Sequence, residues 1–161
     1  MFLFDIKDYL NVGFVKINKR LRETGEKVDP AVIEGLPKVT SLWRGQPTCY
    51  LLNEIRGNVF TGWSWSPKGV TSTSRSYGIA RYFRPKEGAL IYLHDIQGYD
   101  VSIDDYYKKE QEAIVLPGKT YHIKYLIKLD VYVAATNANK LQEGIKYVQS
   151  CGYNFSPIVE D

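Results

Sequence analysis

The sequence predicts a single α+β domain, and three features carry that prediction. The first part of the chain has apolar residues at helical spacing, the middle holds short stretches rich in aromatic and β-branched residues, and another helical stretch follows near the end. Because helices and strands are segregated along the chain, this order favours α+β over a parallel α/β sheet. The 161 residues suit one domain, with a helical lead-in over 1–38, a mainly β core over 39–135 and a helical tail over 136–161.

Two helices are predicted before residue 38. Gly25 is the expected end of the first, and Asp29 with Pro30 begins a short second helix that ends near Gly35 or Pro37. The apolar stripe of the first helix consists of Ile6, Leu10, Phe14, Ile17 and Leu21, with Lys and Arg on the other face.

Strands are predicted from about Thr40 onward, where glycine and proline separate short apolar stretches. The predicted strands cover residues 42–44, 59–60, 70–74, 89–96 and 113–116. The clearest alternation of apolar and polar residues runs over 121–133 and predicts either one long strand or a broken pair. A last helix is predicted over 137–149, where apolar residues return to helical spacing.

Composition and charge narrow the function classes. Hydrophobic residues make up 44% and charged residues 24% of the chain, as in soluble globular proteins. The formal net charge of +3 suits an anionic ligand but forms no basic stripe, so nucleic acid stays open as a partner without being indicated. Cys49 and Cys151 lack metal-binding spacing, and no stretch predicts a signal peptide or a membrane span. We expect no metal, no membrane partner and a cytoplasmic location.

Two segments of the predicted strands carry polar groups suited to a ligand. Arg44 precedes Gly45 at the end of an apolar strand, and its planar guanidinium suits a phosphate or carboxylate as well as a structural ion pair. Ser72, Thr73 and Ser74 lie on a later strand, where small hydroxyl side chains can reach neighbours without filling a cleft. Either segment alone is common in proteins without a ligand site there.

A basic and aromatic segment follows the Ser-Thr-Ser strand. Its residues Phe83, Arg84 and Lys86 could stack a ring and hold a diphosphate. A solvated basic turn would have the same composition.

Glu110 and Glu112 form a Glu-x-Glu triplet directly before an apolar run. If a strand begins at Glu110, the two carboxylates share one face. On an exposed edge they would be a solvated pair. Next to a buried run, one of them is expected in a cleft, where burial and a like charge make it a candidate for catalysis.

In this order, the arginine, the Ser-Thr-Ser segment and the Glu-x-Glu triplet resemble the signature of the arginine-specific mono-ADP-ribosyltransferases, and most of all the small phage enzymes of the Mod/Alt type. The resemblance covers roughly residues 41–121, with Trp43 where the family often has tyrosine. It implies an ADP-ribosyltransferase-like split β-sandwich and NAD as co-substrate without a metal. It further implies target proteins with an accessible arginine, which for a phage or bacterial effector are proteins in the cytoplasm of a bacterial host.

The resemblance also implies roles for individual residues. Glu112 corresponds to the invariant catalytic glutamate, and Glu110 to the residue that engages the acceptor arginine. Ser72 corresponds to the serine that hydrogen-bonds the catalytic glutamate, and Arg44 to an arginine that contacts NAD. Tyr107 falls where related enzymes present an aromatic ring to the target protein.

The resemblance implies a wider set of NAD-binding residues. They are Arg44, Gly45, Ser72, Thr73, Ser74, Phe83, Arg84, Lys86 and Glu112. Phe83 falls where toxin relatives stack nicotinamide, and Arg84 or Lys86 where they bind phosphate.

Two other interpretations stay open. The same fold could serve an NAD glycohydrolase, or a transferase whose acceptor is a nucleic acid or a small molecule. The chain could also be a non-catalytic binding module, with Trp43, Trp63, Trp65 and the 13 tyrosines as a recognition surface. For Trp63 and Trp65, which share one strand face, packing in the core is the expected role.

Overall fold

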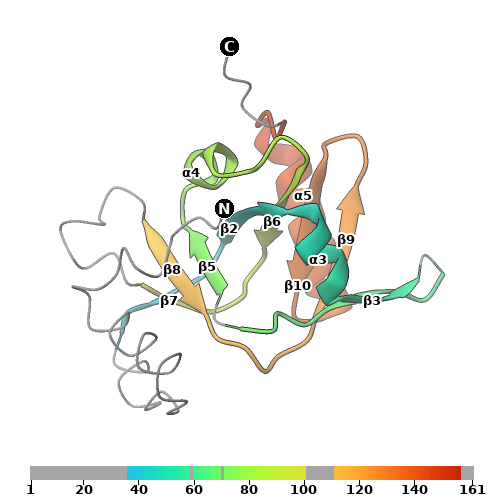
Figure 1. Cartoon of the computed structure of the whole chain (residues 1–161), viewed down its shortest axis with the longest axis horizontal. Coiled ribbons are helices and arrows are strands. Elements are labelled where there is room, and N and C mark those ends of the chain that lie inside the picture. The colour runs from blue at the N-terminus through green and yellow to red at the C-terminus, as the bar shows by residue number, and fades with distance from the viewer. Residues whose placement is uncertain (1–35, 59, 70, 101–110, 157–161) are drawn as a thin grey trace.

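A computed structural model describes residues 36–58, 60–69, 71–100 and 111–156, and Figure 1 shows its arrangement. The two helices predicted before residue 38 lie outside the described residues, and so do Glu110 and Tyr107. The structure therefore bears on the β core and the last helix.

The described strands form one mixed sheet in the order β1-β7-β8-β5-β2-β6-β10-β9-β4-β3. Their bounds are β1 Lys38–Val39, β2 Leu42–Pro47, β3 Ile55–Asn58, β4 Gly62–Trp65, β5 Thr71–Ser74, β6 Gly88–Leu93, β7 Gly98–Asp100, β8 Glu112–Val115, β9 Tyr121–Leu126 and β10 Val131–Ala135. Strands β6 and β10 run parallel, and the other neighbouring strands run antiparallel.

The sheet nearly divides between β5 and β2. These two strands share a single residue pair in the described part of the chain, Trp43 with Ser74, whereas β2 and β6 pair along six positions. The half that contains β8 and β5 thus diverges from the half that contains β2 and β6 (Figure 1). Buried side chains from both halves, such as Ala113 and Val115 on β8 and Leu42 on β2, meet in one apolar cluster. This arrangement agrees with the expected split sandwich.

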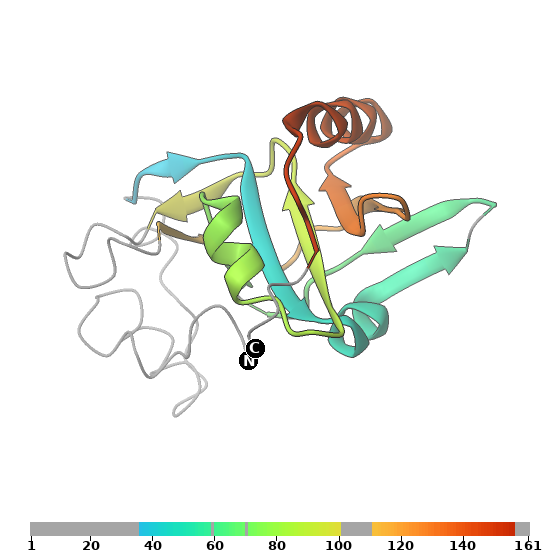
Figure 2. The same ribbon diagram turned by 90° about the horizontal axis from the view of Figure 1, so that it is seen from above.

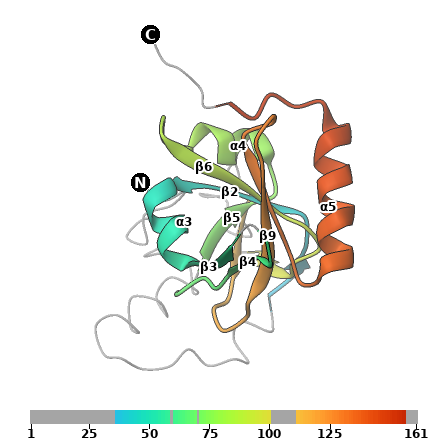
Figure 3. The ribbon, with the colours of Figure 1, turned by 90° about the vertical axis from the view of Figure 1, so that its right-hand side faces the viewer.

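Three helices pack against the described sheet: α3 Thr48–Glu54, α4 Tyr77–Tyr82 and α5 Ala138–Cys151. Figure 3 shows α3 and α5 on opposite sides of the strands. A second apolar cluster on the side of α4 and α5 includes Trp43, Tyr92, Val133 and Val148. Burial of this cluster fixes both helices to the sheet, because apolar surface removed from water is the main stabilising term in folding.

Gly45 explains how closely α4 approaches β2. A Cβ atom at this position would lie 2.4 Å from the Ala80 carbonyl oxygen and 2.8 Å from the Arg84 backbone nitrogen, which is too close for any side chain. Gly45 therefore serves the packing of α4 on the sheet. Its predicted role in binding a cofactor has no support in this position, because its Cα faces the helix.

The predicted α+β class and its C-terminal helix are confirmed. The stretch 121–133 forms two strands, β9 and β10, separated by a turn in which Asp130 has a positive φ of 55°. The strand expected over 59–60 is wrong at Phe60, which lies in the turn between β3 and β4. The Asn58 side chain accepts hydrogen bonds from the backbone N–H groups of Phe60 and Thr61 and forms that turn. Helix α3 was not predicted, because it has seven residues and no polar N-cap side chain.

The β3–β4 hairpin projects away from the rest of the sheet, as Figure 2 shows. Phe60 at its tip is 94% exposed. Within the described residues, no helix is long and apolar enough to cross a membrane.

Candidate active site

Three adjacent strands bring the predicted motifs together. Strand β8 begins at Glu112, β5 carries Ser72, Thr73 and Ser74, and β2 carries Arg44, in the spatial order β8-β5-β2. Residues up to 68 positions apart in the sequence therefore become neighbours across the sheet. The candidate site lies where the two halves of the sheet diverge.

Glu112 is fully buried. Neither of its carboxyl oxygens has a hydrogen-bond partner among the described residues. Burial raises the pKa of this carboxyl group from 4.5 to about 10, because the charged form loses its solvation. A buried, unpartnered carboxyl group destabilises a fold, so its presence here points to a role in chemistry.

The register places Glu112 opposite Ser74, and Ser72 opposite Ile114. The Ser74 hydroxyl accepts a hydrogen bond from the Ser76 backbone N–H at 3.0 Å. Thr73 points to the other face of the strand, where its hydroxyl donates to the Ala113 carbonyl at 2.8 Å. The hydrogen bond from Ser72 to Glu112 that the resemblance implies is not formed in this conformation.

Only part of the Glu-x-Glu triplet lies among the described residues. Strand β8 begins at Glu112, and Gln111 has a positive φ of 47°, which is not the backbone conformation of an extended strand. Glu110 lies outside the described residues, so the expectation that its carboxylate shares a face with that of Glu112 stays a prediction.

Arg44 is held in a defined position. Its side chain is buried, its Nε donates to the Gln46 side-chain oxygen at 2.7 Å, and its Nη1 donates to the Ser72 carbonyl at 2.6 Å. Burial lowers the pKa of the guanidinium to about 10, and the nearby Glu54 carboxylate acts in the opposite direction. Arg44 stays charged at neutral pH and joins the two halves of the sheet.

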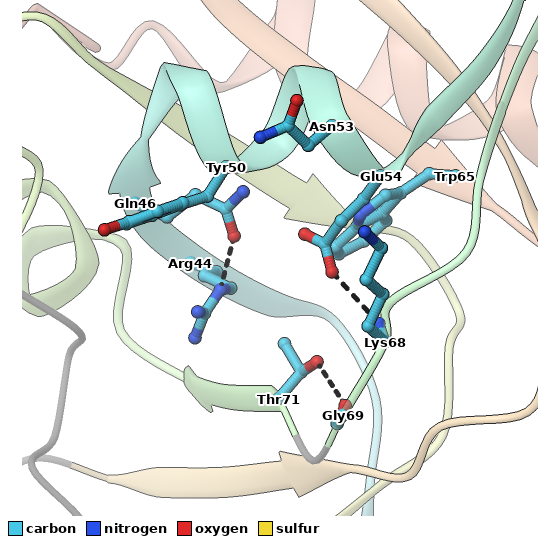
Figure 4. A pocket seen from close by; sticks show the side chains of 9 residues that line it. All are labelled: Arg44, Gln46, Tyr50, Asn53, Glu54, Trp65, Lys68, Gly69 and Thr71. Carbon is cyan, nitrogen blue, oxygen red and sulfur yellow. Dashed lines mark hydrogen bonds between the residues drawn. The ribbon is translucent and has the colours of Figure 1, made fainter.

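A cavity of about 300 Å³ opens beside Arg44 and is drawn in Figure 4. Helix α3 forms one wall, and the segment from β4 to β5 forms another. Its lining includes Arg44, Gln46, Tyr50, Glu54, Trp65 and Lys68. Gln46 and the α3 residues carried no functional prediction. The strand period would have signalled Gln46, since positions 44 and 46 share a face.

Glu112 does not line this cavity. Positions paired across β8, β5 and β2 share one face of the sheet, so Glu112 lies on the face of Ser74 and Trp43. The side chain of Arg44, the residue after Trp43, points to the other face. In this conformation Glu112 on β8 and Arg44 on β2, the strands on either side of β5, do not open into one shared space.

Arg84 occupies a structural position on the α4 side. Its guanidinium donates to the backbone carbonyls of Gly88 at 2.8 Å and Phe155 at 2.5 Å, and to the Asp130 carboxylate at 2.7 Å. These bonds fix the C-terminal segment to the end of α4. The prediction that Arg84 binds phosphate is not supported by this placement, because its donors already serve partners within the fold.

Phe83 and Lys86 lie next to Arg84 on the same stretch. Phe83 forms the C-cap of α4 and packs edge-on against Tyr82 at 5.5 Å between ring centroids. Lys86 is exposed. Neither residue lines the cavity beside Arg44, so the structure does not bring this basic and aromatic segment into that cavity.

The interpretation of the tryptophans as a recognition surface is wrong for two of the three. Trp43 is 3% exposed and Trp65 is 1% exposed, and each belongs to an apolar cluster. The expected core role of Trp65 is confirmed. Trp63 is half-buried and packs against the same cluster as Trp65.

Glu112 supports a prediction about pH and stability. The unfolded chain ionises this carboxyl group above pH 4.5, whereas the folded chain keeps its proton up to about pH 10. The wild-type free energy of unfolding therefore falls as pH rises between these values, by up to about 1.4 kcal/mol per pH unit. Glu112→Gln removes this pH dependence. At pH 7 the free energy of unfolding of the variant should exceed that of the wild type by an amount on the order of 3 kcal/mol, and near pH 4.5 the two values should be equal.

Urea unfolding of both proteins between pH 5 and pH 8 measures this difference. The exposed Glu87→Gln is the matched control and should show no such trend. A difference between Glu112→Gln and wild type that does not change with pH would contradict a buried, protonated Glu112.

Comparison with known proteins gives structural likenesses only. No protein-family model matches the chain, and no curated protein matches it. Plx2a, an ADP-ribosyltransferase toxin from Paenibacillus larvae, is similar over 83% of this chain and 84% of its own, with 20% identity and a TM-score of 0.47. An ADP-ribosyltransferase from Clostridium botulinum is similar over 81% of this chain and 82% of its own, with 16% identity and a TM-score of 0.46.

Exoenzyme S from Pseudomonas aeruginosa, solved with human 14-3-3 protein beta and carba-NAD, is similar over 79% of this chain and 68% of its own. Its identity is 20% and its TM-score is 0.43. At these values a likeness does not establish the reaction of this chain, which has to follow from its own residues.

Among the described residues, no group of three His, Cys, Asp or Glu side chains could hold a metal ion.

Proposed function

We propose that this chain is a mono-ADP-ribosyltransferase that cleaves NAD and transfers ADP-ribose to an arginine side chain of a target protein. The observation that carries the proposal is Glu112, a fully buried carboxyl group without a described hydrogen-bond partner, opposite the Ser-Thr-Ser strand. The order of the three motifs in the sequence supports it, and so does the adjacency of their strands.

Glu112 has the chemistry that cleavage of NAD requires. When the bond between nicotinamide and ribose breaks, its electrons leave with nicotinamide, and positive charge develops at the anomeric carbon. A carboxylate fixed beside that carbon stabilises the charge without having to reorganise. Burial makes this stabilisation strong, because no water screens it.

The raised pKa of Glu112 fits this role when a cation is present. Without a ligand the carboxyl group holds its proton at neutral pH. The positively charged nicotinamide ring of NAD favours the ionised form, since a nearby opposite charge lowers the pKa of an acid. Substrate binding therefore generates the carboxylate that the reaction uses.

Glu110 is proposed to act on the acceptor. Arginine is protonated at neutral pH and is a poor nucleophile until it loses a proton. Glu110 would accept that proton as the guanidinium nitrogen bonds to the anomeric carbon. Tyr107, three residues earlier, is proposed to contact the target protein.

Glu110→Gln is expected to separate the two half-reactions. Transfer to a free guanidine compound should fall by about 10²-fold or more, because the general base is lost. Hydrolysis of NAD should continue, because water needs less activation and Glu112 is intact. Parallel assays of released nicotinamide and of modified guanidine measure both rates. Equal and complete loss of both activities would contradict this division of labour.

The same assays distinguish arginine transfer from the related activities. NAD turnover that does not respond to any guanidine acceptor would identify an NAD glycohydrolase or a transferase with another acceptor. We further propose that the chain acts as a phage or bacterial effector on proteins in a bacterial host cytoplasm. Incubation with tagged NAD and a bacterial lysate, followed by mass spectrometry of labelled proteins, tests this proposal directly.

A further inference from the structure

A second cavity, of about 360 Å³, lies where the β3–β4 hairpin separates from β9. Strand β4 pairs with β9 only from Tyr121 to Ile123, whereas β10 pairs with β9 as far as Leu126. The hairpin projects away from the sheet, as Figure 2 shows. Within the described residues, the last part of β9 therefore has a strand on one side only.

The backbone groups of Tyr125 lie at this open edge. Neighbouring residues of a strand in an antiparallel sheet direct their N–H and C=O groups to opposite sides. The Leu126 carbonyl accepts a hydrogen bond from the Asp130 N–H at 2.8 Å, inside the turn that leads to β10. The groups of Tyr125 consequently point away from β10, to the side where β4 has already ended. A strand edge of this kind is a place where another chain can add by backbone hydrogen bonds.

The two faces of this edge differ in chemistry. Ile123 and Tyr125 lie on one face of β9, and Trp63 of β4 pairs with Ile123 on that face. His122 and Lys124 are exposed on the other face. All of these residues line the cavity. A chain added along this edge would have one face beside apolar and aromatic side chains and the other face beside basic ones.

The charge around the cavity is positive. Among the described residues, no aspartate or glutamate lines it. Lys124 and Lys128 are exposed, and neither forms an ion pair within the described part of the chain. Asp130, in the turn after β9, already accepts from the Tyr125 hydroxyl at 2.6 Å and pairs with Arg84. The surface therefore complements acidic side chains of a ligand.

Two exposed apolar side chains extend this surface. Ile127 lines the cavity and is 80% exposed, and Phe60 at the tip of the hairpin is 94% exposed. Large apolar side chains gathered on one surface are typical of sites that bind proteins or membranes. A lipid surface has no backbone that could pair with Tyr125, so the open strand edge favours a protein.

We propose that this edge of β9 binds an extended segment of a partner protein in which acidic and apolar residues alternate. The segment pairs with the backbone of Tyr125, directs its apolar side chains toward Trp63 and its acidic side chains toward His122 and Lys124. The inference goes beyond the proposed function and does not rest on it. Strands β5, β2, β6 and β10 lie between this edge and Glu112 on β8.

Short capped peptides serve as probes of this edge. A peptide of alternating aspartate and valine has the proposed chemistry, and the same peptide with lysine in place of aspartate is its control. NMR titration of the full-length protein should show that the aspartate peptide binds about tenfold more tightly or better, because like charges repel the lysine peptide. The largest shifts should occur at the amides of Lys124 to Ile127 and at the Trp63 indole.

Two substitutions of exposed side chains test the surface without changing the core. Lys124→Glu reverses a charge, and Ile127→Asp replaces an apolar contact with a charge that repels the aspartate peptide. Each should weaken binding of that peptide by about fivefold or more. Lys119→Glu and Leu52→Asp make the same changes at exposed positions outside the cavity and should bind the peptide like the wild type.

Several results would overturn the proposal. They are a lack of binding of the aspartate peptide, shifts at another surface, and unchanged affinity in both Lys124→Glu and Ile127→Asp. Binding to phosphatidylglycerol vesicles without binding of the peptide would make this surface a membrane contact. A dimer in sedimentation that Ile127→Asp dissociates would make a second copy of the chain the occupant. Either of these two results would also reject a partner protein.

The proposed function is tested separately by NAD cleavage. Ile127→Asp should release nicotinamide at the wild-type rate, because Ile127 lies outside the candidate active site. Peptide binding at this edge by a protein that does not cleave NAD would support the surface and reject the transferase. NAD cleavage that depends on Glu112, without peptide binding, would support the transferase and reject the surface.

Discussion

Glu112→Gln is expected to reduce NAD cleavage by at least about 10²- to 10³-fold, the usual cost of losing one preorganised group that stabilises transition-state charge. Glutamine has nearly the same shape as a protonated glutamate, so the buried position opposite Ser74 stays filled. The variant should fold at least as well as the wild type at neutral pH, because it lacks the pH-dependent penalty of the buried acid. Loss of activity therefore cannot be attributed to loss of structure.

Nicotinamide release from NAD, measured at saturating and at low NAD, gives kcat and kcat/KM for both proteins. The main loss should appear in kcat, because the carboxylate acts on charge that develops in the transition state. Glu87→Gln, the same change on an exposed side chain, should retain wild-type rates. A Glu112→Gln protein that cleaves NAD within a few-fold of the wild type would refute the proposed mechanism.

The pH profile of the wild type adds an independent check. The pKa of Glu112 in the ligand-free protein is raised to about 10, and the reaction needs its ionised form. The value of kcat/KM reports groups of the free enzyme and should therefore rise with pH through the neutral and mildly alkaline range. A profile that is flat from pH 6 to pH 9 would mean that Glu112 is already ionised before NAD binds.

Arg84→Met is expected to destabilise the protein by about 3 kcal/mol or more, which for a chain of this length lowers the melting temperature by roughly 10 °C. The substitution keeps an apolar stem but removes the donors to Gly88, Phe155 and Asp130. Three backbone carbonyls, those of Gly88, Asp130 and Phe155, and the Asp130 carboxylate then lose their shared hydrogen-bond donor. Thermal unfolding followed by circular dichroism measures the change.

This experiment also decides between two roles for Arg84. A structural role predicts lower stability, whereas a phosphate-binding role predicts normal stability with weaker NAD binding. Lys86→Met, the same replacement at an exposed cation two residues later, is the control for stability and should melt with the wild type. A stable Arg84→Met protein with impaired NAD binding would restore the role that the resemblance implied.

The sequence alone was enough to predict the helices and strands that have a clear periodic pattern of apolar residues. Alternation of apolar and polar residues over 121–133 predicted β9 and β10, and helical spacing over 137–149 predicted α5. Glu112 was also accessible from sequence, because an acidic residue directly before an apolar run marks a carboxyl group at the edge of the core. The sequence pattern predicted neither α3 nor the turn at Phe60. Helix α3 is short and has no side-chain N-cap, and the turn depends on one hydrogen bond from the Phe60 backbone N–H to the Asn58 side chain.

Only the tertiary structure decided which polar residues face a cavity. Arg44 and Arg84 are both arginines near a glycine in the sequence. In the structure Arg44 lines the cavity beside helix α3, whereas Arg84 donates a hydrogen bond to the Phe155 carbonyl in the C-terminal segment. The strand period puts Gln46 on the same face as Arg44, but only the folded structure shows that its amide nitrogen is buried without a hydrogen-bond partner among the described residues. The physical reason is that a side chain's hydrogen-bond partners, burial and pKa depend on residues distant in sequence, which no local pattern specifies.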